Sequence, residues 1–453
     1  MKPKKRDLSK TDDLFRSRLD NILNLRHELI KLANSIDWNF LENKVALFYS
    51  DEGRPGIPAR LIIGLHILKH MYNLSDDGVC ERWVENPYYQ YFCGEHYFQH
   101  KFPIERSSMT HFRHRVGEDF CIALLQESLS TAHKLGALET KNLDRIVTDT
   151  TVQEKAITFP TDSKLRYKAI LSLVKIAKKN GIKLRQTYVR VGKIAVVKSS
   201  RYRHAKQLKR AKKQEKKLQT WLGRIIREIE KKTGNNLDLK TIFKEPLFKA
   251  TQIHQQQQSD SNKLYSWHAP EVECISKGKA HKKYEFGCKV SITSHVNPAP
   301  AGHFVLHAKA FHGNPFDGHT LNPVIMEYKA QIGIEPDRIY VDKGYVGHHY
   351  EKKNHVFKSG QKRGVTGSIK KELKRRSMIE PLIGHLKNDG RLGRNYLYGQ
   401  LGDKMNCLMV ASGYNFKLIL RWLRKIFWHY FWEKTICHIF MNKKPISESK
   451  WAF

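Results

Sequence analysis

Two short apolar runs that each end in an aspartate constrain this chain more than any other feature. Residues 145–149 are Arg-Ile-Val-Thr-Asp, and residues 338–342 are Arg-Ile-Tyr-Val-Asp. β-Branched and aromatic residues in such runs favour buried strands. Each run therefore predicts a strand that ends in a carboxylate, Asp149 or Asp342. The two aspartates are 193 residues apart in the sequence.

The chain between these aspartates contains signals for the rest of an α/β unit. Residues 284–294 and 304–311 predict two more strands, and residues 317–329 predict a crossover helix before the strand at 338–342. Connecting these elements requires far fewer residues than the chain supplies. We therefore expect an insertion between the first and second strands, at about residues 164–258.

This insertion is the most basic part of the chain. Residues 164–233 contain 24 Lys or Arg against three Glu. Strong helix formers over 201–218, followed by apolar residues up to Ile229, predict long paired helices. A charge run is usually only a solvated face, but this imbalance is too one-sided for internal salt bridging and favours contact with DNA. Residues 254–262 are predicted to be the linker back to the core. The basic residues that we expect to contact DNA here are Arg201, Arg203, Lys209 and Arg210.

The composition agrees with a polyanionic partner. The 453 residues include 81 Lys or Arg and 44 Asp or Glu, a formal net charge of +37, and neutralised phosphates would supply non-specific affinity. The hydrophobic content of 40% suffices for two or three globular domains. The seven cysteines contain no Cys-x-x-Cys pair, which argues against a structural zinc site or a disulfide framework and for a reducing cytosol.

The two ends of the chain are predicted to be helical. After a disordered basic tail (1–11) that has no secretory signal, residues 12–140 predict an all-α domain, with a helix over 60–68 and another capped by Ser75. A short capped helix over 107–115 would present Arg113 and Arg115 on a basic face. Such helices fit a helix-turn-helix-like DNA-binding unit or a plain support domain. Residues 401–453 predict an amphipathic or buried helical segment, because charged residues exclude a membrane span.

A third carboxylate, Glu380, lies within residues 376–387, Arg-Ser-Met-Ile-Glu-Pro-Leu-Ile-Gly-His-Leu-Lys. Pro381 disfavours helical geometry at the residue before it. Either a helix begins near Glu380, or a longer helix kinks there. In a continuous helix, Arg376, Glu380 and Lys387 would share one face. In both cases the glutamate could reach a metal while Lys387 reaches a phosphate.

The spacing of Arg376, Glu380 and Lys387 resembles the third motif of the DDE transposases of bacterial insertion sequences. The closest resemblance is to the insertion-sequence-five group, whose motif is Tyr, two residues, Arg, three residues, Glu, six residues and Lys. Leu373 occupies the tyrosine position. The similar segments are distributed over most of the length of residues 60–400. They are residues 81–94, 147–153, 268–279, 284–287, 313–320 and 340–347.

This resemblance implies a ribonuclease-H-like α/β catalytic core at 141–400 that carries the basic helical insertion, with the all-α domain before it and the helical segment after it. Asp149, Asp342 and Glu380 would bind two Mg²⁺ ions, for which Mn²⁺ could substitute. Lys343, Arg376 and Lys387 would bind phosphates of the DNA. The implied activity is cleavage at the ends of the element and transfer of the 3′-hydroxyl into target DNA.

The implied partners are double-stranded DNA and further copies of the chain, in a homodimer or a higher synaptic complex in the bacterial cytoplasm, associated with the nucleoid. Three alternatives remain at this point. The first is a catalytically silent DNA-binding regulator descended from a transposase. The second is a ribonuclease-H-like nuclease that cuts without joining, and the third is a basic protein associated with RNA or ribosomes. The carboxylate set argues against the first and third alternatives.

Other residues have simpler interpretations. Asp317 is a rival carboxylate, but it precedes a predicted helix and we interpret it as a helix cap. Trp267 could stack on a base, although core packing is the favoured role. Three histidines near the motifs are interpreted as structural and are left out of the catalytic set. They are His312, His319 and His385.

Overall fold

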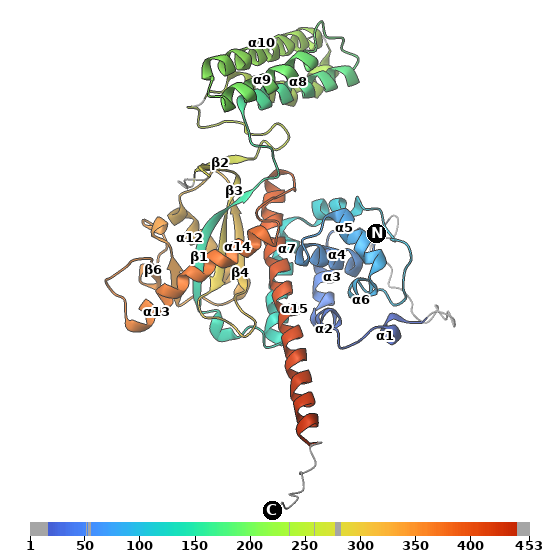
Figure 1. Ribbon diagram of the computed structural model, residues 1–453, viewed down its shortest axis with the longest axis vertical. Helices are drawn as coiled ribbons and strands as arrows, with labels where there is room; N and C mark the ends of the chain where they lie inside the picture. The colour runs from blue at the N-terminus through green and yellow to red at the C-terminus, as the bar shows by residue number, and fades with distance from the viewer. Residues whose placement is uncertain are drawn as a thin grey trace, which may run out of the picture.

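The computed structural model describes residues 17–441, except residues 51, 53–55, 235, 258 and 277–281, and describes only the backbone over 427–441. The basic tail predicted at 1–11 and the end of the predicted C-terminal segment lie outside this range. The described chain is mixed α/β, with helices packed around one curled sheet (Figure 1). No helix of the described part combines the length and apolar character needed to cross a membrane.

In the described part of the chain, seven α-helices precede the sheet. They are α1 (Leu19–Ile22), α2 (Glu28–Ser35), α3 (Trp38–Ala46), α4 (Ala59–Met71), α5 (Asp76–Glu85), α6 (Pro87–Phe92) and α7 (Ser108–Lys134). The Ser75 hydroxyl accepts from the backbone N–H of Gly78 and caps α5, as predicted. The short helix predicted at 107–115 is the first segment of α7, which non-helical backbone at Gly117 (φ 62°, ψ −155°) separates from the second segment. The predicted cap is wrong, because the Ser107 side chain makes no capping hydrogen bond.

The sheet has strands β1 (Arg145–Glu154), β2 (Glu273–Ser276), β3 (Tyr284–His295), β4 (Val305–Phe311), β5 (Arg338–Val341) and β6 (Val356–Lys358). Its order is β4-β3-β1-β5-β6, and β2 pairs with the first residues of β3. The strand β3 runs antiparallel to β1, β2 and β4, whereas β1, β5 and β6 are parallel. The helix α12 (Asp317–Ile332) connects β4 to β5.

The predicted end of the first strand at Asp149 is wrong. The strand β1 continues five residues further, because Thr150, Thr151 and Val152 go on pairing with β3. On its other side β1 pairs with β5 only as far as Val147, which is opposite Tyr340. Asp149 therefore lies in the middle of β1 but beyond the last residue that β5 pairs.

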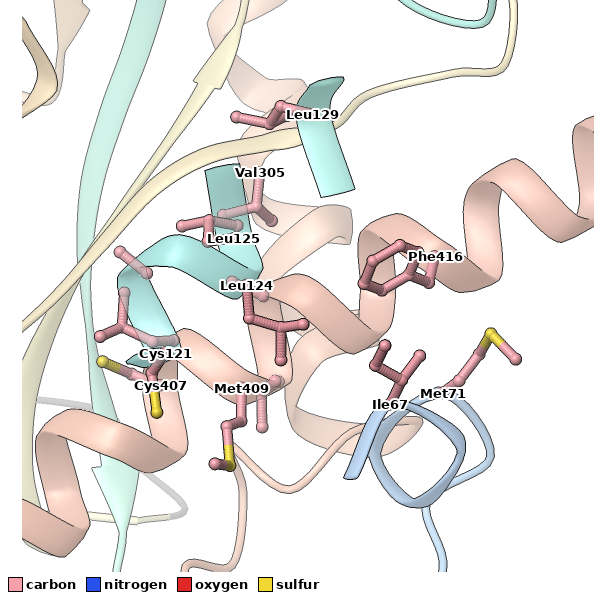
Figure 2. Packing of buried hydrophobic residues seen from close by; sticks show 14 of the residues in the cluster. Ile67, Met71, Cys121, Leu124, Leu125, Leu129, Val305, Cys407, Met409 and Phe416 are labelled. Carbon is pink, nitrogen blue, oxygen red and sulfur yellow. The ribbon is translucent and has the colours of Figure 1, made fainter. Parts of the chain in front are cut away.

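A long C-terminal helix, α15 (Gly399–Met441), lies between the sheet and the N-terminal helices (Figure 1). Figure 2 shows Phe416 of α15 near Ile67 of α4, and Cys407 near Cys121 of α7. These side chains belong to one buried cluster that also includes Val305 of β4 and apolar residues of α12. The N-terminal helices and one face of the sheet therefore share a continuous core through α15.

The described residues between β1 and β2 form α8 (Asp162–Lys179), α9 (Val189–His204), α10 (Leu208–Thr233) and α11 (Leu237–Gln255), which we call the arm. The arm stands apart from the sheet (Figure 1) and has its own hydrophobic cluster. Trp267 packs against that cluster, as favoured from the sequence. Of the 24 Lys and Arg residues between 164 and 233, all except Arg166 are exposed. Nearly all of the arm's positive charge therefore faces solvent.

The helices α13 (Gly367–Arg375) and α14 (Ile379–Asn388) cover the other face of the sheet. Glu372 of α13 is buried and accepts hydrogen bonds from Arg145 and Arg338, each at 3.0 Å, and from the hydroxyl of Tyr340. Burial alone would raise the pKa of Glu372, but the hydrogen bonds from Tyr340 and Arg338 outweigh it, so the pKa lies below its ordinary value. This carboxylate fastens α13 to β1 and β5.

Replacing Leu222 with Ala should destabilise the arm without affecting the sheet. Leu222 is fully buried in the arm's own cluster, and such truncations cost about 2–5 kcal/mol. We expect faster amide hydrogen exchange in α8–α11 and unchanged exchange in β3. The control is Leu208→Ala, because Leu208 is 56% exposed in the same helix. Equal acceleration in arm and sheet would contradict a separate core.

Replacing Glu372 with Gln should lower the free energy of unfolding at pH 7 by about 1–3 kcal/mol, because charge-assisted hydrogen bonds to two arginines are lost. A carboxyl whose pKa is depressed on folding stabilises the fold above its unfolded pKa of about 4.3 and loses that contribution as the pH falls through its folded pKa. The difference between wild type and variant should therefore shrink below about pH 4.3 in denaturant titrations. Glu351→Gln, at an exposed position, serves as the control, and a pH-independent difference would disprove the linkage.

Candidate active site

The register of β1 and β5 brings Asp149 and Asp342 together. Val147 is paired with Tyr340, and each aspartate follows its paired residue by two positions. Since side chains alternate along a strand, both aspartates extend the row formed by Val147 and Tyr340, on the face covered by α13 and α14. Asp342 immediately follows β5 and precedes the short 3₁₀ turn Lys343–Tyr345.

Glu380 reaches the same face from α14. That helix begins at Ile379, and a 3₁₀ turn, Arg376–Met378, joins it to α13. Of the two alternatives left by Pro381, a helix that begins near Glu380 is the one observed. Pro381 therefore lies in the first turn, where a missing N–H donor costs no helical hydrogen bond.

The guanidinium of Arg376 lies among all three carboxylates. Its nitrogens are 3.8 Å from Asp149 Oδ2, 3.7 Å from Asp342 Oδ1 and 3.7 Å from Glu380 Oε1. The Arg376 side chain is only 12% exposed, whereas those of Asp342 and Glu380 are 50% and 66% exposed. The three oxygens thus surround one buried cation on a surface that is open to a ligand.

The three carboxylates do not form a closed cage. Among the described residues, one group of His, Cys, Asp or Glu has ligand atoms all within 4.8 Å of one another, and it consists of Cys288, His312 and Asp403. Lys155 already contacts an oxygen of Asp403 at 2.8 Å, and sulfur and imidazole donors do not suit Mg²⁺. The all-oxygen set around Arg376 is the one that suits a hard divalent cation.

The prediction that Asp317 caps a helix is wrong. Asp317 is the first residue of α12, and its side chain caps no N–H group. Its Oδ1 instead accepts from Thr150 Oγ1 at 2.8 Å and from Lys289 Nζ at 2.9 Å. Thr150 of β1 pairs with Ser291, two residues from Lys289 on β3, so both partners lie on the same face of the sheet. Burial, together with the charges of Asp149 and Asp317, holds the pKa of Tyr345 well above its ordinary value.

The other predicted phosphate ligands of the core lie at the margin of the site. Lys343 is exposed directly after Asp342. Lys387 is near the far end of α14, 3.9 Å from Glu285 of β3. Leu373, at the tyrosine position of the motif, packs with the apolar residues under α13 and α14.

The predicted DNA contacts outside the core differ in accessibility. The four arm residues Arg201, Arg203, Lys209 and Arg210 are all exposed, and Arg203 also pairs with Glu215 at 2.7 Å. In α7, Arg115 is exposed, but Arg113 is buried and bonds both oxygens of Asp76. Arg113 is therefore not part of an exposed basic face.

Sequence reasoning missed two groups that shape this site. Glu372 is four residues before Arg376, in a lysine-rich helix, and no local pattern separates it from a solvated glutamate. The contact of Lys289 with Asp317 joins β3 to α12. The charged Lys289 between Cys288 and Val290 in a predicted strand was the available signal, since a largely buried lysine requires an anionic partner.

Comparison with known proteins places the N-terminal region in a family. Residues 17–115 match a family described as "Transposase domain (DUF772)". A protein of Rhizobium meliloti, described as "Uncharacterized protein ORF8 in nfe locus", is 49% identical over 202 residues, which are 45% of this chain and 98% of that protein. No solved structure matches the chain. The transposase domain at residues 17–115, together with a 49% identical relative of which the chain covers 98%, shows that the chain belongs to a transposase family.

Proposed function

We propose that this protein is a DDE transposase of the insertion-sequence-five type, with Asp149, Asp342 and Glu380 as its catalytic carboxylates. The observation that carries this proposal is the position of Arg376, within 4 Å of an oxygen of each carboxylate. Three carboxylates from distant parts of the chain are costly to gather unless the site uses them.

The topology supports a ribonuclease-H-like core. In that fold the first three strands are antiparallel, the first Asp lies on the first strand, the second follows the fourth strand, and the Glu comes from a later helix. The core has the same order here, if β2 is set aside as an addition to β3. The arm is then an insertion between the first and second core strands.

The residues of the site fit a pair of Mg²⁺ ions. Asp149, Asp342 and Glu380 would hold them, because all three offer carboxylate oxygens. When bound, the ions would activate the attacking oxygen and stabilise the leaving one. Arg376 would bind the phosphate that is cut, since its guanidinium can leave weak ion pairs of 3.7–3.8 Å for a bidentate contact. Mn²⁺ could replace Mg²⁺.

DNA is the partner that this family implies. The arm's exposed cations would bind the backbone of double-stranded DNA without reading its sequence. Lys343 and Lys387 would extend the phosphate contacts of the core. Since two element ends must be processed together, we expect a homodimer or a higher synaptic complex.

Purified protein should cut and join DNA that contains its own element ends, in Mg²⁺ but not in EDTA. Asp342→Asn and Glu380→Gln should each reduce both products on the order of 100-fold or more, because interactions with charge in the transition state are lost. Products are resolved on denaturing gels. Asp337→Asn is the matched control, since Asp337 is an exposed carboxylate at the opposite end of β5.

Three other results would change the proposal. Cleavage without joining would favour a nuclease, and DNA binding without either reaction would favour a silent regulator. Activity that survives in both carboxylate variants would remove these residues from the catalytic set.

Removal of the arm should flatten the salt dependence of DNA binding. The logarithm of affinity falls with the logarithm of salt by about 0.9 per phosphate neutralised, so replacing residues 164–258 with a short linker should lower that slope in fluorescence anisotropy titrations. A second variant retains the arm's fold and changes four exposed residues of α10 to Gln. They are Lys209, Arg210, Lys212 and Lys213. An unchanged slope in both variants would rule out the arm as a DNA-binding surface.

A further inference from the structure

A cavity of about 620 Å³ lies between the N-terminal helices and the segment that leads into α15. Its walls come from α4, α5 and α7 on one side and from residues 391–406 on the other. The carboxylates of the candidate active site do not line it. A volume of this size accommodates a small organic ligand, such as a single nucleotide, but not a DNA duplex.

The floor of the cavity has an excess of positive charge. Lys69 and Arg113 are nearly completely buried and share the carboxylate of Asp76, at 2.7 Å each. Arg391 adds a third cation, and its buried Nε has no hydrogen-bond partner within the described chain. The remaining carboxylate of the lining, Asp77, pairs with Arg106 at 3.2 Å. The lining therefore has three cations, Lys69, Arg113 and Arg391, and one carboxylate, Asp76, to balance their charge.

The titration of Lys69 reflects this imbalance. Burial, and next the neighbouring charge of Arg113, lower the pKa of Lys69 to about 8 even though Asp76 is in contact. A further anion in the cavity would stabilise the protonated lysine and the guanidinium of Arg391. A phosphate has the charge and the acceptor oxygens for these donors.

The mouth of the cavity presents aromatic rings. Tyr396 is 60% exposed and Tyr398 is 62% exposed, and both belong to the lining. The guanidinium groups of Arg391 and Arg394 lie over the Tyr396 ring, at 5.6 and 5.5 Å from its centroid. These cations restrict the orientation of the ring. Exposed tyrosines beside buried cations are the combination that binds single-stranded nucleic acid, because bases stack on the rings while cations hold the backbone.

The geometry points to a binding site for one unpaired nucleotide of a DNA strand, with its phosphate at Arg391 and Lys69 and its base against Tyr396 or Tyr398. The inference rests on the proposed function for the identity of the polymer. The helix α14 links the two sites, since it begins next to Glu380 and ends three residues before Arg391. Its ten residues span about 15 Å, so an unpaired segment of the strand that is cut could reach the cavity.

The test compares two eight-nucleotide probes of equal charge, a thymidine strand and a strand with an abasic tetrahydrofuran sugar at every position. The full-length Asp342→Asn protein is used without divalent metal, so that binding is measured in the absence of cleavage. Because the backbones match, contacts of the arm with phosphates cancel in the ratio of the two affinities. We expect the thymidine strand to bind roughly 5- to 150-fold more tightly, which is the range for stacking of a base on an aromatic side chain.

Changing both Tyr396 and Tyr398 to Leu should reduce this ratio to near one and leave duplex binding unchanged. Arg391→Gln should weaken binding of both probes by a similar factor. Arg26→Gln is the matched control, because Arg26 is an exposed arginine that does not line the cavity. A thymidine monophosphate competitor distinguishes a site for a free mononucleotide from a site for a nucleotide within a strand. Competition at micromolar concentration would show a mononucleotide site and overturn the inference.

A ratio near one in the wild-type background, or a ratio that the tyrosine variant retains, would overturn the inference. Circular dichroism shows whether each variant remains folded. If the double variant unfolds, the ratio of probe affinities is measured with the single Tyr398→Leu variant. If the protein proves not to cut and join DNA, the ratio of the two probe affinities can still be as expected. If that ratio is near one, the cleavage and joining activities are not affected. The two outcomes are therefore distinguishable.

Discussion

The parallel register of β1 against β5 is the constraint on which the candidate site depends. A shift of one residue in this pairing would turn either Asp149 or Asp342 to the opposite face of the sheet. Apolar contacts of Val147 and Tyr340 with Ile379 of α14 keep the strands in register and place that helix on the same face. Glu372 adds a polar fastening, because it binds an arginine from each strand. The contacts that fix the register of β1 and β5 therefore also fix the geometry of the candidate site.

Much of the sheet could be predicted because its signals are local. Apolar runs predicted β3, β4 and β5 to within one or two residues at each end. The length of β1 is underestimated when Asp149 is interpreted as the strand end. The β-branched residues 150–152 also favour a strand, and their pairing with β3 extends it. Asp317 illustrates the same limit. A helix-starting aspartate has a local role by default, and its bonds to Thr150 and Lys289 depend on strands distant in the sequence.

The N-terminal helices show how packing across the molecule overrides local charge patterns. Arg113 and Arg115 are equivalent by sequence, two residues apart in one basic helix. One is buried against Asp76 and the other is exposed, because only one face of α7 packs against neighbouring helices. The arm behaves in the opposite way. Nearly all of its charges face solvent, since its apolar residues are sufficient to form a core of their own.

The charge balance around Arg376 connects the separate parts of the proposed function. Three carboxylates and one guanidinium leave two formal negative charges at a site that is open to solvent, and a cationic ligand would complement this charge. Two divalent cations would more than offset that charge and leave an excess of two positive charges. A DNA phosphate is negative and would reduce this excess, so binding of metal and of DNA should favour one another. Arg376 suits both the site without ligands and the site with metal and DNA bound, because its weak contacts with the carboxylates can be exchanged for a phosphate without moving α14.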